Sequence, residues 1–277
     1  MRPQARIAVG SAATWHFRLA GGIFVALVVG ELAAQTVRGG DGAGPAGWLL
    51  LLGAASWLVG LVWRERVGVA RAWLCFAWVA LPSLLVMQLA VQRGFLFGPL
   101  EFGDRELPRV GPVPLSVPLL WWLVVGGAYL VVEGLWGEMR AGISAFTAVI
   151  TVQLALMVLP FVGAVRDYWR WPVEPAAGAS AAGRFFAVPW SVLAAWLVVA
   201  LGLSLGLVIL GDNWSSADAR SRRQAWAPAA VLLGLSLVCL WAETRAGLWM
   251  AAAFGAANAF LFGTVVVWYL RERTAPR

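Results

Sequence analysis

Charged residues between two strongly apolar stretches are the first candidates for chemistry. In the segment 94–122 they are Glu101, Asp104, Arg105, Glu106 and Arg109. A carboxylic acid next to an apolar phase can act as a general acid, because burial favours its neutral form. A solvated loop, in which arginines balance the carboxylates, is an equally weighted interpretation. Asp104 and Glu101 are therefore candidate acids, and Arg109 is expected to position the loop.

Two further carboxylates fall inside apolar runs. Glu31 is followed one helical turn later by Gln35, and Glu133 lies near the end of a later run. A charged carboxylate at mid-bilayer costs about 3 kcal/mol on insertion scales. Each is expected to be protonated, paired or close to a wet cavity. Glu31 is thus an intramembrane candidate for catalysis, with a helix–helix hydrogen bond as the competing interpretation.

The elements that must position these groups are membrane spans. The chain is 61% hydrophobic and 13% charged, with a mean hydropathy of +0.78. Such a composition predicts a polytopic all-α membrane protein, with residues 1–277 as one integral membrane domain. The expected spans are Leu19–Val37, Pro45–Trp63, Val69–Gln92, Val113–Trp136, Ile143–Val165, Val188–Gly211, Trp226–Trp241 and Leu248–Leu270. The seventh run is the shortest, so seven spans are the alternative.

The distribution of arginines predicts the orientation. With eight spans, the side that holds both termini carries 13 arginines and the other side carries 8. The positive-inside rule then places both termini in the cytoplasm. The connections 94–112 and 166–187 emerge on the opposite face, where two structured loops could close over a shared site.

Several function classes lack their motifs. The sequence contains no Walker loop, HExxH or paired CxxC motif. His16 is the single histidine, and Cys75 and Cys239 both lie in apolar runs. We therefore expect no metal, no cofactor and no nucleic-acid partner, and we assign the net charge of +7 to contact with anionic lipid headgroups.

Two sequence blocks carry a family resemblance. The first is Phe97-Gly98-Pro99-Leu100-Glu101-Phe102-Gly103-Asp104, then Pro108-Arg109, then Val117-Pro118-Leu119 and Trp121. The second is Trp169-Arg170-Trp171, followed by Phe185-Phe186-Ala187-Val188-Pro189-Trp190-Ser191 and Trp196. In order and spacing they resemble the polytopic carotenoid-biosynthesis hydratases, the gamma-carotene and bisanhydrobacterioruberin hydratases of bacteria and archaea.

Several polar positions depart from that family pattern. Leu100 and Phe102 stand where the pattern has tyrosines, and Val192 stands where it has asparagine. Leu159 replaces the aspartate of an Asp-Pro pair, and an upstream carboxylate falls at Met87. The chain is therefore similar to a divergent member of the family.

The resemblance implies a reaction and a site. The reaction is addition of water to the terminal double bond of an acyclic carotenoid end group, in the bacterial cytoplasmic (inner) membrane. The implied acids are Asp104, Glu101 and Glu31. The implied polyene-binding residues are Phe97, Phe102, Trp121, Trp169, Trp171, Trp190 and Trp196, and Arg109, Pro118 and Pro189 would position the loops.

Two other functions stay open. One is a non-catalytic polyene- or lipid-binding protein on the same scaffold, and the more distant one is a small transporter or a membrane subunit of a larger complex. The expected partners are the lipid bilayer and a carotenoid or other polyene, with an oligomer or other pigment-pathway proteins as further candidates.

Overall fold

The fold was examined in a computed structural model, which describes residues 10–38, 42–104, 108–136, 140–172, 184–186, 188–211 and 226–274. Within these ranges, eight helical segments are long and apolar enough to cross a membrane. They are Trp15–Arg38, Gly44–Val67, Val69–Arg93, Ser116–Leu135, Gly142–Val165, Trp190–Gly211, Trp226–Arg245 and Trp249–Arg271. The prediction of a polytopic helix bundle with eight spans is confirmed.

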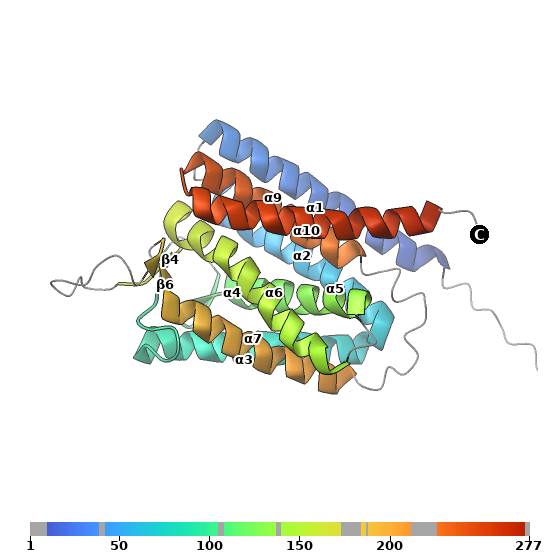
Figure 1. Cartoon of the computed structure of the whole chain (residues 1–277), viewed down its shortest axis with the longest axis horizontal. Coiled ribbons are helices and arrows are strands. Elements are labelled where there is room, and N and C mark those ends of the chain that lie inside the picture. Colours follow the sequence, from blue (N-terminus) through green and yellow to red (C-terminus); the bar gives the residue numbers. More distant parts are fainter. Residues whose placement is uncertain are drawn as a thin grey trace, which may run out of the picture.

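Six of the spans are single helices. These helices are α1 (Gly10–Arg38), α2 (Gly44–Val67), α3 (Val69–Arg93), α7 (Trp190–Gly211), α9 (Trp226–Arg245) and α10 (Trp249–Thr274). Gly94 ends α3 in a left-handed conformation that glycine adopts without strain. In Figure 1, α1, α9 and α10 lie along one side of the bundle, and α3 and α7 lie along the other.

The fourth and fifth spans each contain a π-helical turn. The fourth consists of α4 (Ser116–Trp121), the π-helix η2 (Trp122–Gly126) and α5 (Gly127–Trp136). The fifth consists of α6 (Arg140–Pro160) and the π-helix η3 (Phe161–Val165). The fourth span is also the most enclosed of the eight, with 83% of an apolar 18-residue stretch buried. Such wide turns often occur at functional sites, because they shift the side chains that follow them.

Two predicted span starts are wrong. The fourth and sixth spans begin at Ser116 and Trp190, and the residues before them form short strands. β3 (Val113–Pro114) pairs with β2 (Arg109–Val110), and β6 (Val188–Pro189) pairs with β5 (Arg184–Phe185). Proline in each strand lacks the N–H donor of a helix interior and favours an extended backbone before it, so the helices start later than the apolar runs.

The two long connections join at one end of the bundle. β1 (Glu101–Phe102) pairs antiparallel with β4 (Trp169–Arg170). The N–H of Gly103 donates to the carbonyl of Tyr168 at 2.7 Å. A Cβ at Gly103 would lie 2.8 Å from the carbonyl oxygen of Asp167, so glycine permits this close approach. Among the described residues, the non-glycine positions with positive φ, Leu96, Asp167 and Phe186, all lie in these connections.

Candidate functional site

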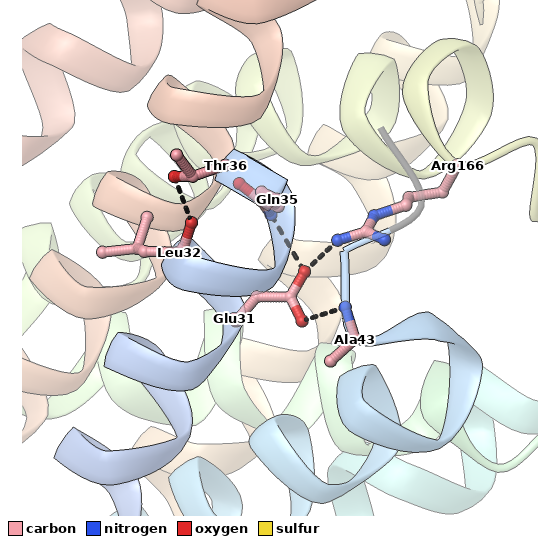
Figure 2. Close-up of polar contacts among 6 residues, drawn as sticks. All are labelled: Glu31, Leu32, Gln35, Thr36, Ala43 and Arg166. Atoms are coloured by element: carbon pink, nitrogen blue, oxygen red, sulfur yellow. Dashed lines mark hydrogen bonds and ion pairs between the residues drawn. The ribbon is translucent and has the colours of Figure 1, made fainter. Parts of the chain in front are cut away.

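A buried ion pair includes Arg166, which lies between η3 and β4. The Arg166 guanidinium contacts the Glu31 carboxylate, and these side chains are 1% and 2% exposed. Gln35 Nε2 donates to Glu31 Oε1 at 2.9 Å, and the N–H of Ala43 donates to Glu31 Oε2 at 3.1 Å (Figure 2). Hydrogen bonds to both oxygens hold the Glu31 carboxylate in one orientation.

Local backbone and aromatic contacts fix this pair. Arg166 directly follows η3, and its N–H donates to the carbonyl of Phe161 at 3.0 Å. The guanidinium lies over the Phe161 ring, with its Cζ 5.1 Å from the ring centroid. Trp48 also packs against that ring, with the two ring centroids 5.1 Å apart and an interplanar angle of 56°. Gly42 has φ +47°, and a Cβ there would collide with Glu31 Oε1 and Arg166 Nη2.

Three polar atoms of this group lack a hydrogen-bond partner among the described residues. They are Nε and Nη1 of Arg166 and Oε1 of Gln35. All three belong to side chains that contact Glu31 Oε1. Unsatisfied buried donors and acceptors that lie this close to one another can hold a water molecule.

A second buried carboxyl group lies on α9. Glu243 is completely buried on α9, and neither of its carboxyl oxygens has a hydrogen-bond partner within the described part of the chain. α9 packs against α1, which carries Glu31, and against η3, which Arg166 directly follows. We define Glu31, Gln35, Arg166 and Glu243 as the polar cluster.

Aromatic residues from the first loop, α4 and α7 form one stack. Trp121 and Trp196 lie parallel, with ring centroids 4.1 Å apart and an interplanar angle of 19°. Phe97 meets the Trp121 ring edge-on at 6.5 Å. All three side chains are fully buried. The structure thus brings together three of the predicted polyene-binding residues.

A second aromatic group spans the β1–β4 pairing. Phe102 meets Trp169 edge-on at 5.5 Å, and Trp169 and Trp171 are 6.5 Å apart. The Trp171 ring lies 3.5 Å from the position of a Cβ on Gly163 in η3. The aromatic group therefore packs against the turn that carries Arg166.

The remaining predicted binding and positioning residues have different surroundings. Trp190 is 49% exposed and packs against Phe185 at 5.5 Å, apart from the two buried aromatic groups. Pro118 is buried in the first turn of α4. Pro189 lies opposite Arg184 in the β5–β6 pairing.

The loop carboxylates lie in a different environment from Glu31. Asp104 is fully exposed, and its Oδ1 is 4.0 Å from Nη2 of Arg109. Glu101 is also exposed. The Arg109 guanidinium donates to the carbonyls of Gly103 and Phe102, which is a loop-positioning geometry. Arg105 and Glu106 lie outside the described residues.

Sequence reasoning missed Arg166 as the partner of Glu31, and it missed Glu243. The predicted seventh span ended at Trp241, whereas the helix continues to Arg245 and carries Glu243 inside the bundle. The available signal was Glu243 itself, an acidic residue that directly follows an apolar run and comes just before Arg245. The Arg166 contact gave no local signal, because 135 residues separate the partners.

Fold and polar cluster together define an integral membrane protein with a buried charged centre at one end of its helix bundle. Residues 46–262 match the family model described as carotenoid biosynthesis protein. The chain belongs to this family and has a role in carotenoid biosynthesis. No curated protein and no solved structure matches it. Arg166 and Glu243 lie inside the matched segment, and Glu31 precedes it.

Proposed function

We propose that this protein adds water to the terminal double bond of an acyclic carotenoid end group, which gives a tertiary alcohol. Family membership supports a carotenoid as the substrate class. The observation that carries the proposal is the buried Glu31–Arg166 ion pair, which lies beside unsatisfied polar atoms and packed aromatic rings. A hydration site needs a fixed negative charge, a place for one water and exclusion of bulk solvent.

The chemistry explains why these groups belong together. Protonation of the less substituted carbon of the double bond leaves a tertiary carbocation at the neighbouring carbon. Water then attacks this cationic carbon. A carboxylate that is already oriented stabilises the developing positive charge without reorganising. Glu31 fits this role because Arg166, Gln35 and Ala43 hold both of its oxygens.

Water delivery has a structural candidate beside this carboxylate. Nε and Nη1 of Arg166 and Oε1 of Gln35 offer two donors and one acceptor. A buried water typically makes about three hydrogen bonds, and these atoms suit one. We assign them to the water that attacks the cation.

Flat aromatic faces suit the polyene. We assign the Trp121–Trp196 stack and the Phe102–Trp169–Trp171 group to binding of the conjugated chain near the polar cluster. Exposed carboxylates are well solvated and form weak pairs. We therefore assign Asp104 and Glu101 to the outer loop and put the chemistry at the buried end.

Labelled water tests the proposal directly. Purified protein in lipid nanodiscs is incubated with lycopene in water enriched in ¹⁸O, and the pigments are separated and weighed by mass spectrometry. We expect a hydroxylated carotenoid with one ¹⁸O at each hydrated end. Carotenoid that stays bound but unchanged would favour the non-catalytic polyene-binding alternative and reject hydration.

A further inference from the structure

We infer that Glu243 is the proton donor of this site, a neutral carboxylic acid held inside the bundle near the Glu31–Arg166 ion pair. The inference rests on the proposed hydration. Its first support is burial, since the Glu243 side chain is 0% exposed and neither oxygen has a hydrogen-bond partner among the described residues. An ionised carboxylate without a partner is very costly to bury, so the neutral acid is favoured.

The position of Glu243 on its helix also favours the neutral acid. Glu243 lies in the last turn of α9, which ends at Arg245. Its own carbonyl accepts the N–H of Leu248 at 2.9 Å, in the connection that follows the helix. The C-terminal end of a helix carries partial negative charge, which disfavours a second negative charge there.

Three buried or partly buried carboxyl groups can be compared, and two have guanidinium partners. Glu31 pairs with Arg166, and Glu133 pairs with Arg66. Within the described part of the chain, Glu243 has no ion pair of this kind. Acid and base assignments follow from carboxyl groups whose environments favour opposite protonation states. Glu31 is therefore the fixed carboxylate of the polar cluster, and Glu243 is its acid.

The proton step balances without an oxidant or a reductant. The O–H bond of Glu243 breaks, and the π electrons of the terminal double bond form a C–H bond at the less substituted carbon. Glu243 becomes a carboxylate, and the neighbouring carbon becomes a tertiary cation. Water forms the C–O bond and releases its extra proton to Glu243, which restores the neutral acid. The sum is the addition of one water.

Substitution of the acid by its amide is the main test. Glu243→Gln keeps the shape and removes the proton, so we expect a loss of hydroxylated carotenoid of at least about 100-fold, at the lower bound for general acid catalysis. Bound carotenoid and thermal stability should stay at wild-type values. Glu243→Asp should retain part of the activity, because it keeps an acid at a slightly shorter reach. Glu133→Gln is the control and should form product like the wild type.

Infrared difference spectroscopy provides a readout that does not depend on turnover. A neutral carboxylic acid has a carbonyl stretch apart from the amide bands, which shifts in D₂O. We expect such a band in the wild type and its loss in Glu243→Gln. Wild-type product formation in Glu243→Gln, or a band unchanged by this substitution, would overturn the inference while leaving the proposed hydration intact. A wild-type protein that forms no hydroxylated product would overturn both.

Discussion

Two Glu–Arg ion pairs occupy opposite ends of the bundle, and their surroundings differ. Glu31 and Arg166 are 2% and 1% exposed, whereas Glu133 and Arg66 are 15% and 7% exposed. Ala43, which contacts Glu31, immediately precedes α2, and Arg66 lies near the end of that helix. At 1.5 Å per residue, Ala43 and Arg66 are roughly 35 Å apart along the helix axis.

The difference indicates that the Glu133–Arg66 pair stabilises helix packing, whereas the Glu31–Arg166 pair belongs to the candidate site. Arg66 of α2 and Glu133 of α5 link two neighbouring spans at a partly exposed position. In the Glu31–Arg166 pair, Arg166 lies just before β4 in the second connection, with Gln35 and the Phe161 ring in contact with the pair. Buried charge is costly, so a buried pair with unsatisfied neighbours points to function.

Removal of one partner should have the largest effect. Arg166→Met leaves the Glu31 carboxylate buried without its cation, and we expect a loss of about 3–5 kcal/mol in the free energy of unfolding. Arg66→Met should cost less, because Glu133 retains some contact with solvent. Thermal unfolding in detergent measures both variants. Equal losses would remove the distinction between the two pairs, and the double variant Glu31→Gln/Arg166→Met should recover most of the stability.

The second prediction concerns the backbone at the ion pair. Gly42 and Gly44 both have positive φ, at +47° and +75°, so alanine at either position carries a strain of about 1–2 kcal/mol. At Gly42 the added Cβ also collides with the ion pair, whereas at Gly44 nothing lies within 4 Å. Gly42→Ala should therefore lose about 1–3 kcal/mol more than Gly44→Ala, since it disturbs a buried charged hydrogen bond. An equal loss of stability in the two variants would mean that Gly42 is needed only for its positive φ and not for its contact with the ion pair.

A smaller effect is expected within the aromatic stack. A double-mutant cycle with Trp121→Leu and Trp196→Leu should give a coupling energy of about 0.5–1.5 kcal/mol. The Phe185–Trp190 pair is the comparison, and it should couple more weakly because Trp190 is half exposed. Thermal stability of the four proteins of each cycle provides the measurement. A larger coupling energy at Phe185–Trp190 than at Trp121–Trp196 would contradict the expectation that the buried pair contributes more to stability.

The smallest effect is expected four residues after Arg166. Arg170 pairs with Asp167 in the exposed part of the same connection, and the hydrogen bonds and charge of Asp167 raise the pKa of its guanidinium. Exposed pairs contribute little to stability and are screened by salt. Arg170→Gln should leave the melting temperature within experimental error, most clearly at high salt. A loss as large as that of Arg166→Met would show that burial does not distinguish the two arginines.

Apolar runs made most of the fold predictable, and long-range contacts limited the rest. The eight spans follow from composition, and wrong starts occur where Pro114 and Pro189 place strands before helices. Glu31 could be singled out because a carboxylate inside an apolar run is costly. Its partner could not, since the π-helical turn that places Arg166 depends on packing against α9. The burial of Glu243 could not be predicted because the seventh helix continues beyond the apolar stretch that marks it in the sequence.

The most direct test compares neutralisation of the two carboxylates that pair with arginine, Glu31 and Glu133. Glu31→Gln and Glu133→Gln are expressed in a lycopene-producing host, and hydroxylated carotenoid is measured per amount of folded protein. We expect product to fall by at least about 100-fold in Glu31→Gln, in proportion to lost electrostatic stabilisation of the cation. Glu133→Gln should keep wild-type product. Equal product from both variants would contradict the assignment of chemistry to the Glu31–Arg166 end of the bundle.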